Sequence, residues 1–373
     1  MLQGFRLYDA DAHVKFSPAM WKTLPDEYTA RRPRAVRVSD GSGLSWNEGW
    51  LIEGRMEPHP FGPGTQGADK PGDVLVEFGA SSESAGSFDL THPAARIKDM
   101  DRLGIDSQML FPTTLYAKLG SDSGFEAAMF RAYNRYIGEQ CRYDSRRLKW
   151  AGLLPLRERH QALAALDEMQ KLGATAAVVY GTAGEKPLGH SSFEFIWGEL
   201  ASRRLPLCIH MGMSHPALEA LCDSRLEAHT IGMSFPGLIA FAGIVGHGVI
   251  DRHSNLKVAF LEFGAEWIFY MVGRISHYLP SYRNDPAIKH LPTSTIENSL
   301  RSGRVFLAPE AEDRWLAAEI ELIGEDHILY GSDFPHGEGR EEAATEFLRR
   351  AELTPAQKEK IFYKNAVKLF GEP

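Results

Sequence analysis

The stretch that decides the fold is Phe5–Val14, which reads FRLYDADAHV and joins an apolar strand pattern to the motif Asp11-x-His13. Side chains on a strand alternate between its two faces, so residues two apart point the same way. Asp11 and His13 are therefore expected to project together from the carboxyl end of a first strand. A carboxylate and an imidazole held side by side supply two ligands for a divalent metal ion. The motif also arises by chance, so its meaning depends on the residues that lie near it in the fold.

The composition indicates a globular protein without nucleic-acid or membrane partners. The chain has 373 residues, of which 43% are hydrophobic and 24% charged, enough for a large core. A net charge of −8 gives no reason to expect nucleic acid. We find no signal-peptide pattern and no apolar run that approaches 18 residues, so we expect a cytoplasmic protein. Cys141, Cys208 and Cys222 lack CxxC spacing and are expected to be free thiols.

Short apolar segments alternate with helical patterns along most of the chain. Strands are expected at 5–14, 105–111, 149–154, 174–180, 206–210, 257–262, 305–308 and 327–331. Strands that are apolar on both faces and alternate with helices pair in parallel, with helices covering the sheet. Eight such units predict one α/β domain over 1–373, a closed (β/α)8 TIM-like barrel. A doubly wound open sheet is the alternative, but no glycine-rich phosphate loop follows the first strand.

A long insertion, residues 15–91, follows the first strand. Its stretches 53–64 and 79–84 are rich in Gly, Pro and Ser and have no steady period, which indicates irregular structure. Loops of this length usually form a lid, a binding insertion or a contact between subunits. Aromatic residues within it, including Trp46, Trp50 and Phe61, favour an apolar or ring-bearing substrate.

Polar residues stand at the carboxyl ends of the expected strands, where TIM barrels carry their active sites. They are Asp11 and His13 after strand one, Thr113 and Thr114 after strand two, His210 after strand five, Glu262 after strand six, and Asp333 and His336 after strand eight. Buried carboxylates need a partner, and a divalent cation would neutralise them. Each residue alone could instead cap a helix or pair with an arginine, but this explanation is weak for the whole set.

Four regions of the chain resemble the signatures of the amidohydrolase superfamily, and the most similar branch is the one related to aminocarboxymuconate semialdehyde decarboxylase. These regions are Phe5–Val14, Cys208–Gly212, Phe260–Arg274 and Tyr330–His336, with further similarity at Asp101–Asp106, Trp197 and Lys364–Ala366. The resemblance implies a metal-dependent barrel enzyme whose divalent ion is held by Asp11, His13, His210 and Asp333.

The chain departs from the family pattern at three places. Asp11 replaces the first histidine of the usual pair, Glu262 replaces a catalytic histidine of the decarboxylases, and strand four lacks the superfamily's bridging lysine. The carboxylate-rich set suits iron or manganese, or two metals, better than a single zinc ion. We therefore expect one or two ions of iron, zinc or manganese. Glu262 could bridge two ions, with His229 as a candidate ligand of the second unless His229 lies in a surface loop.

Three functions are compatible with such a site. The first is hydrolysis of an amide, ester, thioester or lactone by metal-bound water, with Asp333 and Glu262 as catalytic residues. The second is non-oxidative decarboxylation of an aromatic or enoic acid, which the resemblance implies. The third is oxygen activation by a dinuclear iron centre. A non-catalytic metal-binding subunit is a further alternative, although the four retained ligands argue against it.

Four further residues are expected to bind a small-molecule substrate: Thr113, His215, His336 and Arg274. His215 and His336 flank the expected ligands, and Arg274 could either bind a substrate carboxylate or tie its helix to the barrel or a neighbouring subunit. We also expect a homo-oligomer, a dimer built on the insertion and on the helix that follows strand six.

Overall fold

The computed structural model describes residues 1–39, 46–53, 55–57, 86–113, 122–286, 288, 290–336 and 343–373. Phe61, Thr114 and the glycine- and proline-rich stretch 58–85 of the expected insertion lie outside these ranges. The division of the chain into one domain with an insertion stays a prediction.

Seven strands form one parallel sheet that curls into a barrel. In spatial order they are β1 (Tyr8–Val14), β5 (Ser107–Pro112), β6 (Leu148–Leu153), β7 (Ala176–Tyr180), β10 (Leu207–His210), β11 (Val258–Leu261) and β12 (Val305–Leu307). Each lies within a few residues of an expected strand, because each is a short apolar run bounded by glycine, proline or polar residues. The fold is thus the expected α/β barrel of TIM type.

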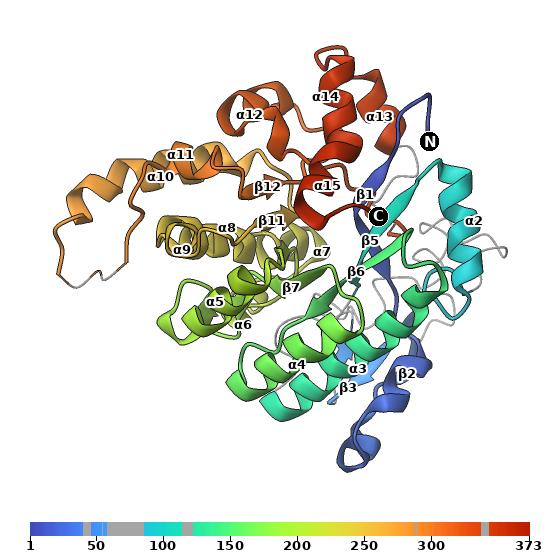
Figure 1. The fold of residues 1–373 in the computed structure, drawn as a ribbon. Coiled ribbons are helices and arrows are strands. Elements are labelled where there is room, and N and C mark those ends of the chain that lie inside the picture. Colours follow the sequence, from blue (N-terminus) through green and yellow to red (C-terminus); the bar gives the residue numbers. More distant parts are fainter. Residues whose placement is uncertain are drawn as a thin grey trace.

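The segment 328–334 closes the barrel between β12 and β1. The Leu329 N–H donates to the Leu307 carbonyl at 2.8 Å, and the Ala10 N–H donates to the Tyr330 carbonyl at 2.8 Å. This segment forms isolated parallel bridges rather than a regular eighth strand. The closure brings the start and the end of the chain together, and in Figure 1 the blue first strand lies beside the red C-terminal helices.

Helices surround the sheet, as Figure 1 shows. They are α2 (Pro93–Leu103), α3 (Ser123–Cys141), α4 (Arg159–Lys171), α5 (Glu194–Arg203), α6 (Pro216–Glu219), α7 (Arg225–Glu227), α8 (Phe235–Phe241), α9 (Val249–Arg252), α10 (Trp267–Tyr282), α11 (Ile296–Leu300), α12 (Leu316–Ile323), α13 (Ala343–Arg349), α14 (Pro355–Glu359) and α15 (Asn365–Phe370). Two short strands, β8 (Thr182–Ala183) and β9 (Lys186–Pro187), form a separate hairpin.

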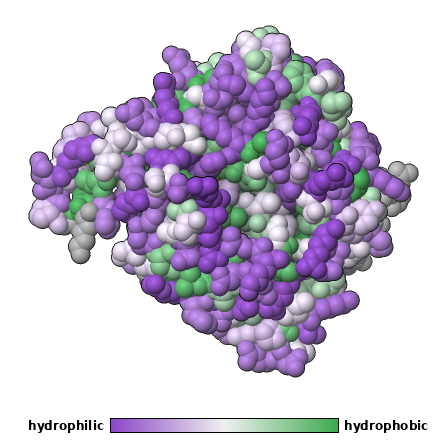
Figure 2. Space-filling model, viewed as in Figure 1, coloured by the Kyte–Doolittle hydropathy of each residue, from purple (hydrophilic) through white to green (hydrophobic). Residues whose placement is uncertain are grey.

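The core lies inside the barrel and between the sheet and its helices. The strands β5, β7, β10, β11 and β12 are buried along their whole length, as expected for parallel strands covered on both faces. Trp150 and Trp197 are among the largest fully buried side chains. All three cysteines are free, as the sequence predicted, and all three are buried. In the view of Figure 2 the surface is mostly hydrophilic, with hydrophobic residues in small separate groups.

Part of the expected insertion is regular, so the expectation of irregular structure is wrong there. Two 3-10 turns, Pro18–Thr23 and Asp26–Arg31, lead into a three-stranded antiparallel sheet of β2 (Arg34–Ser39), β3 (Trp46–Ile52) and β4 (Arg55–Glu57). Aromatic packing attaches this sheet to the barrel end of β1, since the Phe16 ring lies 5.0 Å from Trp21 and 5.8 Å from Trp50. A role as lid or subunit contact stays a prediction.

One helical run, Ala228–Gly246, is long and apolar enough to cross a membrane by length and composition alone. The expectation that no apolar segment approaches 18 residues is therefore wrong. The run consists of two π-helical segments, Ala228–Met233 and Ala242–Gly246, on either side of α8. Half of it is buried inside the protein, and Phe241 packs on Phe260 of β11 at 5.6 Å, which is the behaviour of a core helix.

Candidate metal centre

A bulge in β1 aims the first two expected ligands into the barrel. Asp9 pairs with Gln108 of β5 and Ala12 pairs with Leu110, so β1 contains one residue more than its partner over this stretch. Such a bulge changes the direction of the side chains next to it. Asp11 is 3% exposed and His13 is fully buried, and both belong to the cluster described next.

Two overlapping groups of side chains at the carboxyl ends of the strands could hold a metal ion. The first consists of Asp11, His13, His210 and Glu262, and the second of His13, Glu262, Asp333 and His336. Within each group, the possible ligand atoms all lie within 4.8 Å of one another. All six residues are among those predicted from the sequence, and they come from four strand ends that are far apart in the chain.

The spacing of the donor atoms fits a single cation. His13 Nε2 lies 2.9 Å from Glu262 Oε2 and 3.2 Å from Asp333 Oδ1. His210 Nε2 lies 3.0 Å from Glu262 Oε2 and 3.2 Å from Asp11 Oδ1. Two atoms bound at about 2.1 Å to one ion, at a right angle or a tetrahedral angle, are about 3.0–3.4 Å apart. These five side chains, Asp11, His13, His210, Glu262 and Asp333, are called the donor set below. Their atoms are spaced like the ligands of one metal ion.

The backbone fixes the tautomer of His210. Its Nδ1 lies 2.9 Å from the Met211 carbonyl, an acceptor, so Nδ1 carries a hydrogen and Nε2 is the ring nitrogen that faces the cluster and could bind a metal ion. Burial disfavours charge on His210, but the carboxylates of Asp11 and Glu262 outweigh burial and raise its pKa well above the usual value. Burial also opposes charge on Glu262, yet His210 and His13 hold its pKa well below the usual value. The cluster thus strongly favours a positive charge at its centre.

Two of the clustered carboxylates come from residues with a left-handed backbone. Glu262 has φ +67° and Asp333 has φ +54°, a region that residues other than glycine rarely adopt. Such a conformation costs about 1–3 kcal/mol and persists only where surrounding contacts impose it. Here it turns each side chain from the end of its strand towards His13.

A short chain of hydrogen bonds runs from Asp333 to the second strand. His336 Nδ1 lies 2.6 Å from Asp333 Oδ1, and His336 Nε2 lies 3.2 Å from the Thr113 hydroxyl. The Thr113 hydroxyl donates to the Val14 carbonyl at 3.2 Å. Burial lowers the pKa of His336 well below its usual value. Thr113 and His336, both expected to bind substrate, thus lie at the cluster.

Three of the expected site residues lie elsewhere. His229 is in the π-helical segment Ala228–Met233 and belongs to neither group of possible ligands among the described residues, so its ligation stays a prediction. His215 caps α6, since its Nδ1 accepts from the Ala217 N–H at 3.2 Å. Arg274 is exposed on α10 and donates to the Tyr278 hydroxyl at 2.6 Å.

Two ionisable residues near the cluster were not predicted. Glu310 follows β12, and although solvent reaches it, burial first and the charge of Glu262 second raise its pKa to about 8. The strand-end rule, applied to strand seven, would have found it. Lys15 follows β1, its Nζ lies 5.2 Å from the centre of the Phe88 ring, and burial lowers its pKa to about 8.

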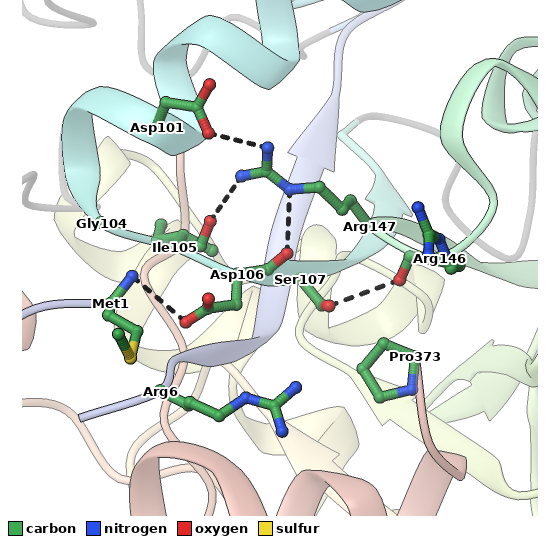
Figure 3. Close-up of a pocket in the computed structure, with 10 residues that line it drawn as sticks. All are labelled: Met1, Arg6, Asp101, Gly104, Ile105, Asp106, Ser107, Arg146, Arg147 and Pro373. Atoms are coloured by element: carbon green, nitrogen blue, oxygen red, sulfur yellow. Dashed lines mark hydrogen bonds and ion pairs between the residues drawn. The ribbon is translucent and has the colours of Figure 1, made fainter. Parts of the chain in front are cut away.

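The pocket in Figure 3 lies at the opposite end of the barrel. It has a volume of about 550 Å³, and its walls include residues just before β1, β5 and β6, such as Arg6 and Arg147. The Arg147 guanidinium is occupied, because it donates to Asp101 at 2.7 Å and to the Ile105 and Asp106 carbonyls at 2.8 and 3.0 Å. In barrels of this type this end stabilises the fold, and chemistry occurs at the other.

Imidazoles and carboxylates gathered at the carboxyl ends of barrel strands define an enzyme with a candidate metal centre. The sequence matches the family described as "Amidohydrolase" over residues 10–371. The protein therefore belongs to the amidohydrolase family, as the resemblance implied.

Two curated relatives are both 6-methylsalicylic acid decarboxylases. The one from Aspergillus aculeatus is 30% identical over 173 residues, which cover 46% of this chain and 51% of the relative. The one from Penicillium expansum is 26% identical over 199 residues, which cover 53% and 59%. The chain thus matches about half the length of each relative.

Solved structures share the fold. An amidohydrolase of Mycobacterium avium subsp. paratuberculosis has a TM-score of 0.77 at 23% identity and covers 99% of this chain and 100% of its own. A manganese-bound 5-carboxyvanillate decarboxylase of Novosphingobium aromaticivorans has a TM-score of 0.70 at 17% identity and covers 99% and 97%. The chain therefore shares its fold with an amidohydrolase and with a decarboxylase.

Proposed function

We propose that the protein is a metal-dependent, non-oxidative decarboxylase of a hydroxylated aromatic acid. The proposal rests on the pair Asp333–His336. The hydrogen bond of this pair can hold a proton directly beside the side chains whose spacing fits the ligands of a metal ion. The activity of the two curated relatives supports decarboxylation over the hydrolysis and oxygen chemistry that the sequence also allowed.

The metal would be held by His13, His210, Asp11, Glu262 and Asp333. Three carboxylates and two imidazoles form a hard, oxygen-rich set, which favours manganese or iron. A bound divalent ion would hold the carboxylate and a neighbouring hydroxyl oxygen of an aromatic acid and would favour ionisation of that hydroxyl, which makes the ring richer in electrons and easier to protonate. We propose one ion per chain, with manganese as the first candidate.

The hydrogen bonds made by His336 indicate which group carries the proton between His336 and Asp333. Because the Thr113 hydroxyl donates to the Val14 carbonyl, its oxygen accepts from the Nε2–H of His336. A neutral imidazole with hydrogen on Nε2 has a lone pair on Nδ1, so the proton of the 2.6 Å contact comes from the Asp333 carboxyl. Asp333 is thus the proton donor in this proposal, and His336 holds the proton in place.

The reaction balances without an oxidant or water. The proton passes from Asp333 Oδ1 to the ring carbon that bears the carboxylate, and a new C–H bond forms. The C–C bond to the carboxylate then breaks, its electron pair returns to the ring, and CO₂ leaves. His13 and His210 would hold the metal ion, which would supply a fixed orientation for the substrate oxygens.

The decisive experiment is anaerobic incubation of the manganese-loaded enzyme with 2-hydroxybenzoic acids in D₂O. We expect CO₂ and a phenol with one deuterium at the former carboxylate position, and no product after treatment with EDTA. Absence of CO₂, together with hydrolysis of amide or lactone substrates, would return the function to the hydrolase hypothesis. A requirement for O₂ would favour the oxygenase.

Metal content per chain tests the number of ions. One manganese ion in the wild type is the expected result, with weakened binding in Glu262→Ala. Two ions in the wild type and one in Glu262→Ala would instead establish a dinuclear centre with Glu262 as a bridge.

We also propose that the protein forms a homodimer through α10. This helix exposes Phe269, Tyr270, Tyr278 and Tyr282, which are 38%, 65%, 46% and 44% accessible, an unusual density of aromatic side chains for a solvated helix. Light scattering should give twice the chain mass for the wild type and the chain mass for Tyr270→Glu. A cytoplasmic location stays a prediction.

A further inference from the structure

A buried polar network lies directly beneath the candidate metal centre. Arg96 of α2 donates through Nε to Gln108 Oε1 at 2.8 Å, and Gln108 Nε2 donates to Asp9 Oδ2 at 2.9 Å. Ser332 donates to Asp9 twice, from its hydroxyl at 2.6 Å and from its backbone N–H at 2.9 Å. Arg96, Gln108 and Asp9 are fully buried, and none of the four belongs to the donor set.

This network holds the residues on both sides of Asp333. On one side, Ser332 is fixed by Asp9, and its hydroxyl accepts from the Phe334 N–H at 3.1 Å. On the other side, the Phe334 carbonyl accepts from the His13 N–H at 2.6 Å and lies 3.5 Å from Arg96 Nη2. The Asp333 N–H itself donates to the Asp11 carbonyl at 2.9 Å.

The same network reaches the other end of the donor set. Arg96 Nη2 donates to the His13 carbonyl at 3.0 Å, and Asp9 Oδ1 accepts from the Asp11 N–H at 3.3 Å. The Arg96 guanidinium also lies 4.6 Å from the centre of the Phe334 ring. Three of the five proposed ligands are therefore attached, through their own or adjacent backbone groups, to one buried unit.

Burial of this polar network costs free energy, so its presence calls for an explanation. The buried Arg96 guanidinium loses its hydration, and negatively charged groups must offset this loss. Here they are Asp9, which is linked to Arg96 through Gln108, and the nearby Asp99. An apolar set of the same volume would give comparable or better stability. The left-handed conformation of Asp333 supplies a reason for the network, because that conformation persists only when neighbouring groups impose it.

We propose that Asp9, Gln108, Arg96 and Ser332 are positioning residues, which hold Asp333 in its left-handed conformation and thereby determine the metal affinity of the site. This inference rests on the proposed metal centre and deepens it. None of the four touches the metal or the substrate, so they act through the orientation of Asp333, His13 and Asp11. Groups behind metal ligands of this kind typically change affinity by about 10- to 100-fold.

The test compares Ser332→Ala with Ser107→Ala. Both changes remove one buried hydroxyl from the barrel, but Ser107 lies at the opposite end, where it donates to the Arg146 carbonyl at 3.4 Å (Figure 3). We would measure the Mn²⁺ dissociation constant by electron paramagnetic resonance, the Tm of the metal-free proteins, and kcat at saturating Mn²⁺.

We expect Ser332→Ala to weaken Mn²⁺ binding about tenfold and to broaden the Mn²⁺ signal, with a metal-free Tm close to that of Ser107→Ala. Ser107→Ala should bind Mn²⁺ like the wild type. Asp9→Asn, which keeps the side-chain volume and one oxygen acceptor, should weaken binding as well. If Ser332→Ala folds less well, Asp9→Asn provides the same comparison.

Two results would overturn the inference and are distinguishable. Wild-type Mn²⁺ affinity in both Ser332→Ala and Asp9→Asn, with only a lowered metal-free Tm, would make the network purely structural and leave the proposed function intact. A wild-type protein that binds no Mn²⁺, Fe²⁺ or Zn²⁺ would overturn the metal centre, the proposed function and this inference together.

Discussion

Asp333 stands between two imidazoles, and its replacement by asparagine separates its two proposed roles. The carboxylate lies 3.2 Å from His13 Nε2 and 2.6 Å from His336 Nδ1. An asparagine amide can still donate to His336 Nδ1, so Asp333→Asn preserves the hydrogen bond and the side-chain volume. It removes the acidic proton that can be transferred to the substrate.

The expected loss follows from the role of that proton. A positioned acid contributes about 10²- to 10⁴-fold to the rate of a proton transfer. This corresponds to about 3–5 kcal/mol of activation free energy. Because the amide keeps the geometry, we expect the loss in kcat, with KM changed much less. Metal affinity should also fall, since an amide is a weaker ligand than a carboxyl group, which can lose its proton when a metal ion binds.

The assay is CO₂ release at a Mn²⁺ concentration that saturates the variant, so that weaker metal binding does not contribute. Asp326→Asn is the matched control, because Asp326 is an exposed carboxylate that pairs with Lys360 at 2.7 Å and such surface pairs contribute little. A kcat for Asp333→Asn within threefold of the wild type would refute the assignment of Asp333 as proton donor.

Further predictions concern the site and the stability of the fold. Thr113→Val removes the acceptor of the His336 Nε2–H, and we expect kcat to fall about tenfold, with little change in KM, in the same assay; an unchanged kcat would contradict the proton assignment. Addition of Mn²⁺ at about 100 times its dissociation constant should raise the unfolding free energy of the wild type by about 2.7 kcal/mol. The same Mn²⁺ concentration should raise the unfolding free energy of Asp333→Asn by less, and urea titration measures both values. Burial raises the pKa of Glu319 from 4.5 to about 8, so the folded protein holds a proton that the unfolded chain has lost, and stability falls as the pH rises between these values. Glu319→Gln should therefore add up to about 4–5 kcal/mol at pH 8.5 and almost nothing at pH 4.5, and equal effects at both values would disprove the shift. Phe260→Ala empties a core site between Phe241 and Trp267 and should cost about 3–5 kcal/mol of unfolding free energy.

The sequence was sufficient for the barrel and for most of the cluster. Strand 149–154 appears as Leu148–Leu153 and strand 257–262 as Val258–Leu261, because short apolar runs between turn residues leave few alternatives. His210 and Glu262 were found because parallel strands bring their carboxyl ends to one face of a barrel. This rule needs no knowledge of side-chain contacts.

Other features depend on contacts between distant segments and were missed. The β1 bulge and the left-handed conformation of Asp333 lie beside the buried contacts of Asp9 and Arg96, and in the sequence these two are ordinary polar residues in a strand and a helix. The antiparallel sheet β2–β4 was missed because such pairing depends on cross-strand neighbours.

The closure of the barrel by residues 328–334 has a consequence for the order of events during synthesis. Asp9 and Ser332, which lock the seam, are separated by 323 residues, and a ribosome that adds about 5–20 residues per second needs roughly 15–65 s to make both. During that time His13 and Asp11 have left the ribosome but lack Asp333, so a nascent chain cannot assemble the proposed donor set. Loading of the proposed metal would then follow translation, and the ion that enters would depend on what the finished protein meets in its compartment.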